Sequence, residues 1–170
     1  NLEIKAPVAD PPAFRARARG LATETVGVDE QVDTYFRVPA GRLKLREGSL
    51  SGGQLVPYHR PDADGPRRSD YQVIPVEDAA GLKALLAAML GVHRIVRKRR
   101  EIWLHDGVRI HLDHVAGLGD FMELEAIFDG SPAAERDQRR KLELLMEALG
   151  VCRDELIAGS YEALVASEGG

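Results

Sequence analysis

The chain has 170 residues, enough for a sizeable core, and we expect a single domain over 1–170. Its net charge of −4 at pH 7 and its 5% aromatic content disfavour a general nucleic-acid binder, because basic surface and base-stacking rings are both scarce. The one cysteine, Cys152, excludes an internal disulfide and favours a cytoplasmic setting. The sequence has no apolar run of about 18 residues and no signal-peptide pattern, so we do not expect a membrane protein.

Alternating residue patterns dominate the N-terminal half. Asp10 followed by Pro11 predicts the start of a short helix. The segment 61–68 is rich in Pro, Gly, Asp and Arg, which is typical of a loop. The predicted strands, separated by the helix or by turns, cover 1–7, 23–38 as one strand or two, 42–47 and 54–60.

The C-terminal half combines strands with two long helices. Strands are expected over 69–76 and 92–104. Asp78 caps a helix that ends at Gly91, and we expect its apolar stripe to cover one side of the sheet. A second helix starts at Ser131 and buries Leu142, Leu145, Met146 and Leu149, and one or two short helices in the tail dock through Tyr161, Leu164 and Val165.

The most informative stretch is a hairpin over 108–125. Side chains of a strand alternate between its faces, so Arg109, His111 and Asp113 share one face and apolar residues the other. A Gly-Leu-Gly-Asp turn reverses the chain, and Glu123 and Glu125 again share one face. The hairpin is therefore predicted to have one apolar and one ionic face.

The same arrangement recurs along the chain. Each ionic pair is spaced by two or four residues on a predicted strand, so both members lie on the same face of a sheet. Two interpretations are open: this face is exposed to solvent, or the sheet curls into a barrel with its charges inside. In the second case the cations would bind phosphates and the acids would bind Mg²⁺ or Mn²⁺. The pairs are Glu3 and Lys5, Lys44 and Arg46, Lys98 and Arg100, Arg109 and Asp113, and Glu123 and Glu125.

Several motifs resemble those of the CYTH superfamily, which includes class IV adenylyl cyclases and thiamine triphosphatase. Asn1-Leu2-Glu3-Ile4-Lys5 is similar to the family's E-x-E-x-K signature, with Asn1 in place of the first Glu. Leu45-Arg46-Glu47, Lys98-Arg99-Arg100 and the block from Leu112-Asp113-His114 to Glu123 extend the resemblance over nearly the whole chain. The resemblance implies an α+β fold built on a closed, antiparallel, eight-stranded barrel, the triphosphate tunnel.

The resemblance also implies roles for individual residues. Glu3, Asp113 and Glu123 would be catalytic, metal-binding carboxylates, assisted by Glu125. Asn1 brings no charge, which bears on whether a second metal ion binds. Phosphate would be held by basic side chains: Lys5, Arg46, Arg60, Lys98 and Arg100, with Lys44 and Arg109 as further candidates on the same strand faces.

Four functions remain open at this stage. The first is a class IV adenylyl cyclase, which forms cyclic AMP and pyrophosphate from ATP with Mg²⁺ or Mn²⁺. The second is a hydrolase of thiamine triphosphate or inorganic tripolyphosphate. The third, favoured by Asn1, is a non-catalytic binder of organic polyphosphates. The fourth, RNA binding through 94–100, has no interleaved aromatic residues to support it. We expect no nucleic-acid or membrane partner, and a homodimer is compatible with the sequence.

Overall fold

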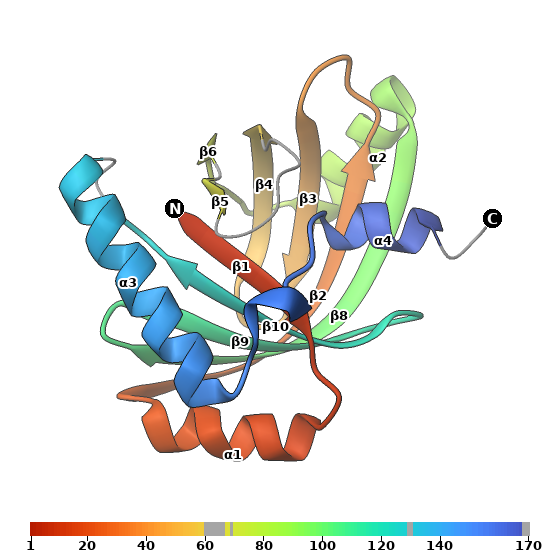
Figure 1. Cartoon of the computed structure of the whole chain (residues 1–170). Coiled ribbons are helices and arrows are strands. Elements are labelled where there is room, and N and C mark those ends of the chain that lie inside the picture. The colour runs from red at the N-terminus through yellow and green to blue at the C-terminus, as the bar shows by residue number, and fades with distance from the viewer. Residues whose placement is uncertain (60–66, 69, 129–130, 168–170) are drawn as a thin grey trace.

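The computed structural model describes residues 1–59, 67–68, 70–128 and 131–167. They form one strongly curled antiparallel sheet whose concave side is open to a cavity (Figure 1). Helices α1 (Pro11–Leu21) and α3 (Pro132–Leu149) lie on the outer side of the sheet, whereas α4 (Tyr161–Ser167) lies across one end of the curl. The predicted mainly β fold with covering helices is therefore confirmed.

Ten strands make up the sheet in the described residues, and three of them are only two or three residues long. Their order is β5-β1-β10-β9-β8-β2-β3-β4-β6, with β7 also paired to β4. The strands are β1 (Leu2–Pro7), β2 (Glu24–Phe36), β3 (Arg42–Gly48), β4 (Gly52–His59), β5 (Arg67–Arg68), β6 (Asp70–Tyr71), β7 (Ile74–Val76), β8 (Val92–His105), β9 (Val108–Val115) and β10 (Gly119–Ala126).

The expected closed eight-stranded barrel is only partly confirmed. Short strand β5 pairs with β1 and short strand β6 pairs with β4, so these two strands form the edges of the sheet. Within the described residues no hydrogen-bonded ladder joins the two edges. Two-residue strands contribute very few ladder bonds, and the predicted strand over 69–76 is divided into β6 and β7. The sheet is curled like a barrel but is not closed by its hydrogen bonds.

The hydrophobic core lies between the outer face of the sheet and helices α1 and α3. Leu2 and Ile4 of β1 and Ile110 of β9 are almost completely buried against Phe14 of α1 and Leu142 of α3. The caps follow the sequence prediction, because Asp10 accepts a hydrogen bond from Ala13 N and Ser131 accepts one from Ala134 N. Since apolar side chains take the outer face, the ionic positions of the same strands face inward.

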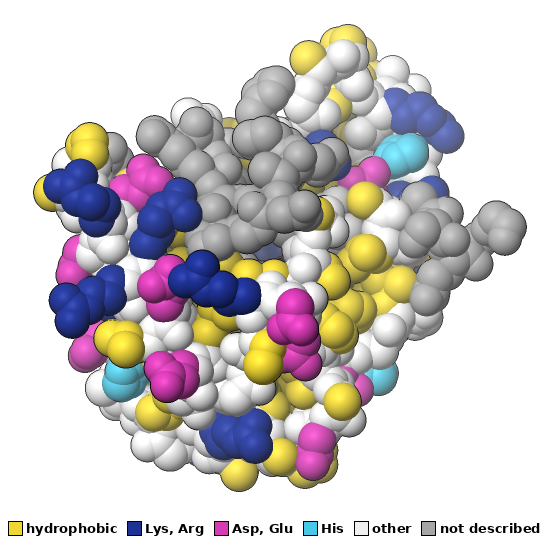
Figure 2. Space-filling view, viewed as in Figure 1, with side chains coloured by type: hydrophobic (Ala, Val, Ile, Leu, Met, Phe, Trp, Pro, Cys, Tyr) yellow, Lys and Arg dark blue, Asp and Glu magenta, His cyan; other side chains and the backbone are white. Residues whose placement is uncertain are grey.

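Helix α2 (Ala79–Leu90) departs from its prediction. It lies against β2 and β3, but none of its residues is buried, and Leu85 and Met89 are 55% and 75% exposed. The expected apolar cover is instead supplied by α1 and α3. Charged side chains of both signs line the exposed face of α3 (Figure 2), where Glu135 pairs with Arg139. No helix in the described part of the chain is long and apolar enough to span a membrane.

Candidate functional site

The concave side of the sheet encloses a cavity of about 670 Å³. Inward-facing residues of β1, β2, β3, β4, β8, β9 and β10 line it, together with Ser160 and Tyr161 near the start of α4. Lys98 and Arg100 of β8 are 6% and 7% exposed, whereas Arg97 and Arg99 on the opposite face are exposed. The alternation predicted for this strand is therefore confirmed.

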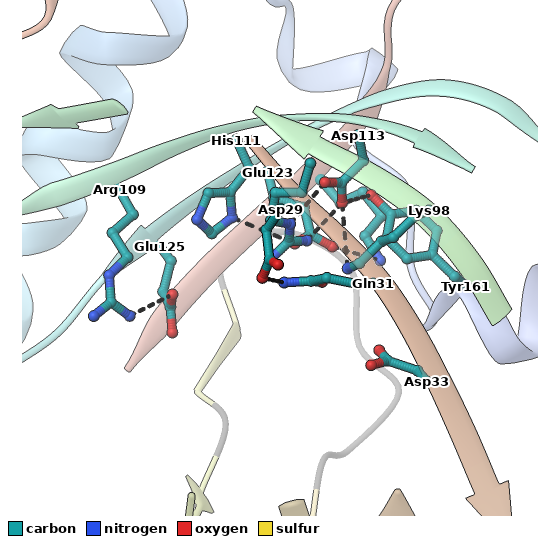
Figure 3. A network of polar contacts seen from close by, with 12 residues as sticks. Asp29, Gln31, Asp33, Lys98, Arg109, His111, Asp113, Glu123, Glu125 and Tyr161 are labelled. Carbon is teal, nitrogen blue, oxygen red and sulfur yellow. Dashed lines mark hydrogen bonds and ion pairs between the residues drawn. The ribbon is translucent and has the colours of Figure 1, made fainter. Parts of the chain in front are cut away.

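Arg100 is the centre of the largest charge cluster, and Figure 3 labels its partners Asp113 and Glu123. Its guanidinium forms a bidentate pair with Asp113, with Nε–Oδ1 and Nη2–Oδ2 distances of 2.6 and 2.5 Å, and it also contacts Glu123. Lys5 Nζ lies 3.0 Å from Glu123 Oε1, and Lys98 Nζ lies 3.5 Å from Asp113 Oδ2. Residues from four strands therefore form one buried network of three cations and two carboxylates.

The network shifts the pKa values of its members. Burial lowers the pKa of Lys98 to about 7, and the charge of Arg100 acts in the same direction. Burial alone would raise the pKa of Asp113, but Arg100 and Lys98 outweigh it and hold that pKa at about 2. For Glu123 burial is likewise outweighed by Arg100 and Lys5, so its pKa lies well below the usual value. At neutral pH both acids are ionised and Lys98 is near its midpoint.

A second charge cluster lies on β2 and β3. Asp33 accepts hydrogen bonds from Arg46 Nε and Nη2 at 2.7 and 2.8 Å and lies 2.8 Å from Lys44 Nζ. Burial would raise the pKa of Asp33, but Arg46 and Lys44 hold it well below its usual value. Lys44 and Arg46 thus project into the cavity as predicted, while their partner Asp33 was not recognised from the sequence.

The third charged group lies at the other end of the cavity from Lys98 (Figure 3). Glu125 accepts hydrogen bonds from Asn1 Nδ2 at 2.7 Å and from Arg109 Nη1 at 3.2 Å. Glu3 stands directly opposite Glu125 in the β1–β10 ladder. Like charges at directly opposed positions destabilise a sheet, and Arg109 offsets part of the charge of this pair.

The donor chemistry of this end fits a hard divalent cation. Glu3, Glu123 and Glu125 supply carboxylate oxygens from the two neighbouring strands β1 and β10, and such oxygens are the ligands that Mg²⁺ and Mn²⁺ prefer. In the described part of the chain, however, no three acidic, histidine or cysteine side chains are gathered closely enough to hold a metal ion as they stand. Metal binding would therefore require these carboxylates to rotate toward one another.

Asp113 differs from the other predicted site residues. Its side chain is fully buried and does not line the cavity, because Arg100, Lys98 and the hydroxyl of Tyr161, at 2.8 Å, surround its carboxylate. This geometry suits a residue that orients Arg100 better than one that reaches a ligand. The predicted phosphate-binding residue Arg60 lies outside the described residues.

Tyr161 is the main site residue that sequence reasoning assigned a different role. It was expected to dock the tail, and it does so by packing edge-on against Phe121. Its ring also lies 3.6 Å from Lys5 Nζ and 5.0 Å from Lys98 Nζ, within the range of cation–π attraction. Its position beside these lysines depends on a contact between the two ends of the chain, for which the sequence carries no local signal.

Other lining residues follow the same alternation, although they were not among the predicted site residues. Asp29, Gln31, Asp33 and Tyr35 alternate along β2 in the same way as the five recognised ionic pairs. His111 also lines the cavity, and its Nδ1 lies 3.7 Å from Glu123 Oε2. Burial lowers the pKa of His111 and Arg100 adds to this effect, so its imidazole is neutral at pH 7.

Comparison with known proteins agrees with this architecture. The family model of the CYTH domain matches residues 1–161. Adenylate cyclase CyaB from Aeromonas hydrophila is 31% identical over 174 residues, covering 96% of this chain and 87% of that protein.

The PH1012 protein from Pyrococcus horikoshii has the same fold, with a TM-score of 0.80, 23% identity and coverage of 96% and 98% of the two chains. HpAC1 from Hippeastrum, whose structure is reported as revealing a dominant triphosphatase activity, aligns with a TM-score of 0.60 and 16% identity over 88% of each chain. The chain belongs to the CYTH domain family.

Proposed function

We propose that this protein is a divalent-metal-dependent enzyme that converts ATP into cyclic AMP and pyrophosphate. One observation carries the proposal: five cationic side chains from β1, β3 and β8 converge on one cavity. They are Lys5, Lys44, Arg46, Lys98 and Arg100. Lys and Arg at such density match the oxygens of a triphosphate. The similarity to adenylate cyclase CyaB supports ATP as the molecule that carries this triphosphate.

The two charge clusters divide the binding task. Lys44 and Arg46 on one wall and Lys98 and Arg100 on the other would contact the β- and γ-phosphates, with Lys5 beside them. Asp33 and Asp113 hold the guanidinium groups of Arg46 and Arg100 in fixed orientations, and such preorganised donors stabilise developing charge well. Asp113 is thereby proposed as a positioning residue.

The acidic end would hold the metal ion. Glu3, Glu123 and Glu125 are the proposed ligands, and Asn1 can contribute an amide oxygen without charge. When bound, Mg²⁺ or Mn²⁺ would supply Lewis-acid polarisation of the α-phosphate. The cationic clusters beside the acidic end would hold the phosphate groups of the substrate next to it.

The reaction follows from this placement. The ribose 3′-hydroxyl gives its proton to solvent water and its oxygen forms a bond to the α-phosphorus, while the bond from that phosphorus to the bridging oxygen of the β-phosphate breaks. Pyrophosphate leaves with the bonding electrons. Lys98 and Arg100 lie where the charge of the leaving pyrophosphate would build up, so they would stabilise the transition state.

Triphosphate hydrolysis is the second candidate. It is favoured by the likeness in fold to HpAC1, for which a dominant triphosphatase activity is reported, although at 16% identity the likeness concerns the fold alone. The same cations would bind the substrate, and water in place of the 3′-oxygen would attack the terminal phosphorus. The replacement of the signature's first Glu by Asn1 favours a third candidate instead, the binding of organic polyphosphates without turnover.

Product identification tests the proposal. The full chain is incubated with ATP, thiamine triphosphate or tripolyphosphate and millimolar Mg²⁺ or Mn²⁺, and the products are separated by ion-exchange chromatography. An Arg46→Ala variant is the matched control, because it removes one phosphate ligand. Cyclic AMP with pyrophosphate, absent or strongly reduced in the variant, would support the cyclase. Orthophosphate alone would identify a hydrolase, and unchanged substrate would refute both enzymatic assignments.

A further inference from the structure

Exposed hydrophobic side chains gather around the cavity. Ten large hydrophobic residues of the described chain are at least 40% exposed, and four of them, Val26, Leu50, Val73 and Ile127, line this cavity. Ile102 and Leu104 of β8 line it as well. Single exposed apolar residues are common, but a group beside a cavity marks a binding surface. None of the charged clusters above uses these residues.

The apolar residues occupy a defined end of the cavity. The inward positions of β8 are Lys98, Arg100, Ile102 and Leu104, so this strand changes from cationic to apolar between Arg100 and Ile102. Leu104 pairs with Arg109 and Ile102 with His111 in the β8–β9 ladder. Arg109 in turn lies at the acidic end with Glu125 (Figure 3). The apolar wall therefore adjoins the proposed metal ligands, and Lys98 and Leu104 are about 20 Å apart along the strand.

A break in the alternation of β2 adds Val26 to this wall. The other inward residues of β2 have odd numbers, from Asp29 to Tyr35. The register between β2 and β8 shifts between Thr25 and Gly27, and because of this bulge the even-numbered Val26 also faces the cavity. Bulges re-aim single side chains and are common beside functional sites. Here the bulge brings an apolar side chain to the same end as Ile102 and Leu104.

A buried carboxylate holds Leu50 over the cavity. Asp29 is 0% exposed and accepts hydrogen bonds from Leu50 N at 2.7 Å, Ser51 N at 3.4 Å and Gln31 Nε2 at 2.7 Å. These bonds fix the β3–β4 turn against β2. Leu50 Cδ2 lies 3.6 Å from where a Cβ on Gly27 would stand, so Leu50 covers the bulge. A leucine that is 52% exposed in so ordered a turn is well placed to cover a ligand.

We infer that Val26, Leu50, Ile102 and Leu104 bind the organic part of the substrate, so that this site takes triphosphate esters of a planar heteroaromatic group in preference to inorganic tripolyphosphate. The inference rests on the proposed function for the phosphate end of the cavity. A heteroaromatic ring buried on aliphatic side chains gains hydrophobic stabilisation that tripolyphosphate cannot obtain. The bulge and the Asp29 contacts preorganise this wall before the substrate arrives.

Differential binding tests the inference. Affinities for ATP, thiamine triphosphate and tripolyphosphate are measured by isothermal titration calorimetry with Mn²⁺ on the full chain. The wild type is compared with the double variant Val26→Ser/Leu50→Ser and with Leu144→Ser on α3, which is 57% exposed outside the cavity. The double variant should lose about tenfold in affinity for the organic triphosphates, since each truncated side chain removes part of the apolar contact. Its tripolyphosphate affinity should change less than about twofold, and Leu144→Ser should change none of the three.

Each result has a distinct meaning. A loss for ATP alone would assign the wall to nucleosides, and a loss for thiamine triphosphate alone would assign it to the thiamine ring. A loss for both supports heteroaromatic esters in general. No loss for either organic ligand would overturn the inference and leave the proposed phosphate site untouched. Equal losses for tripolyphosphate and ATP would overturn it as well, because the four residues would then act on phosphate binding and not on the organic part. If the wild type binds none of the three ligands, the proposed function and this inference both fail.

Discussion

Replacing Lys98 by methionine should stabilise the free protein at low pH. The lysine is buried, and its pKa falls from 10.5 to about 7 through burial and the charge of Arg100. At about 1.4 kcal/mol for each pH unit, this difference corresponds to about 5 kcal/mol of unfavourable free energy for the charged form. Methionine has similar length and no charge, but Asp113 loses one of its three partners. We therefore expect a net gain of about 2–4 kcal/mol in the free energy of unfolding at pH 6.

The pH dependence of this gain identifies its origin. Because the folded state has the lower pKa, the cost of Lys98 is complete below about pH 7 and fades as the pH rises toward 10.5. The gain from Lys98→Met, measured by urea unfolding, should therefore be smaller by about 3 kcal/mol at pH 9.5 than at pH 6, which leaves it near zero. Lys83→Met is the control, because Lys83 pairs with Glu47 outside the cavity and is 38% exposed. A gain equal at both pH values, or a loss at pH 6, would refute the reasoning.

Two further predictions concern ligands. Arg100→Ala should weaken tripolyphosphate binding by about 1.5–3 kcal/mol in calorimetry, because a charged hydrogen-bond donor is lost, whereas Arg99→Ala on the outer face should change it little. Equal losses would indicate a basic outer surface instead of an inward-facing site. Millimolar Mn²⁺ should raise the melting temperature of the wild type, since a cation bound to the folded state stabilises it by RT ln(1 + [L]/Kd). Glu123→Gln should lose most of this increment and the exposed Glu143→Gln should keep it; a full increment in Glu123→Gln would remove Glu123 from the metal site.

Local patterns predicted the elements that depend on local chemistry. The two-residue period of β8 separates Lys98 and Arg100 from Arg97 and Arg99, and any extended chain obeys that period. Helix starts at Asp10 and Ser131 were also predictable, because a capping side chain bonds to an amide only three residues away. In both cases the deciding interaction lies within a few residues along the chain.

Non-local contacts limited the rest. The strand face on which Asp113 lies was predicted. The burial of its side chain, however, depends on Arg100 and Tyr161, which come from a different strand and from the C-terminal region. The apolar stripe of α2 was read as buried, yet burial depends on which element lies opposite, and α1 and α3 take the core instead. The bulge that turns Val26 inward could not be predicted from the sequence either, because it is defined only by how β2 pairs with β8.

The ion pairs within the cavity would let one site accept both phosphates and a metal ion, as proposed above. Six basic and five acidic residues line it in the described chain: Lys5, Lys44, Arg46, Lys98, Arg100 and Arg109, against Glu3, Asp29, Asp33, Glu123 and Glu125. A sixth acid, Asp113, lies behind Arg100. A free triphosphate would bring several negative charges beside Asp33 and Glu123, and a free metal ion would bring positive charge beside Lys5 and Arg109. A metal–triphosphate complex adds far less net charge. Its binding would replace ion pairs between protein side chains by ion pairs between the protein and the complex. The free-energy cost of removing the protein charges from water has then already been met on folding and does not weaken binding.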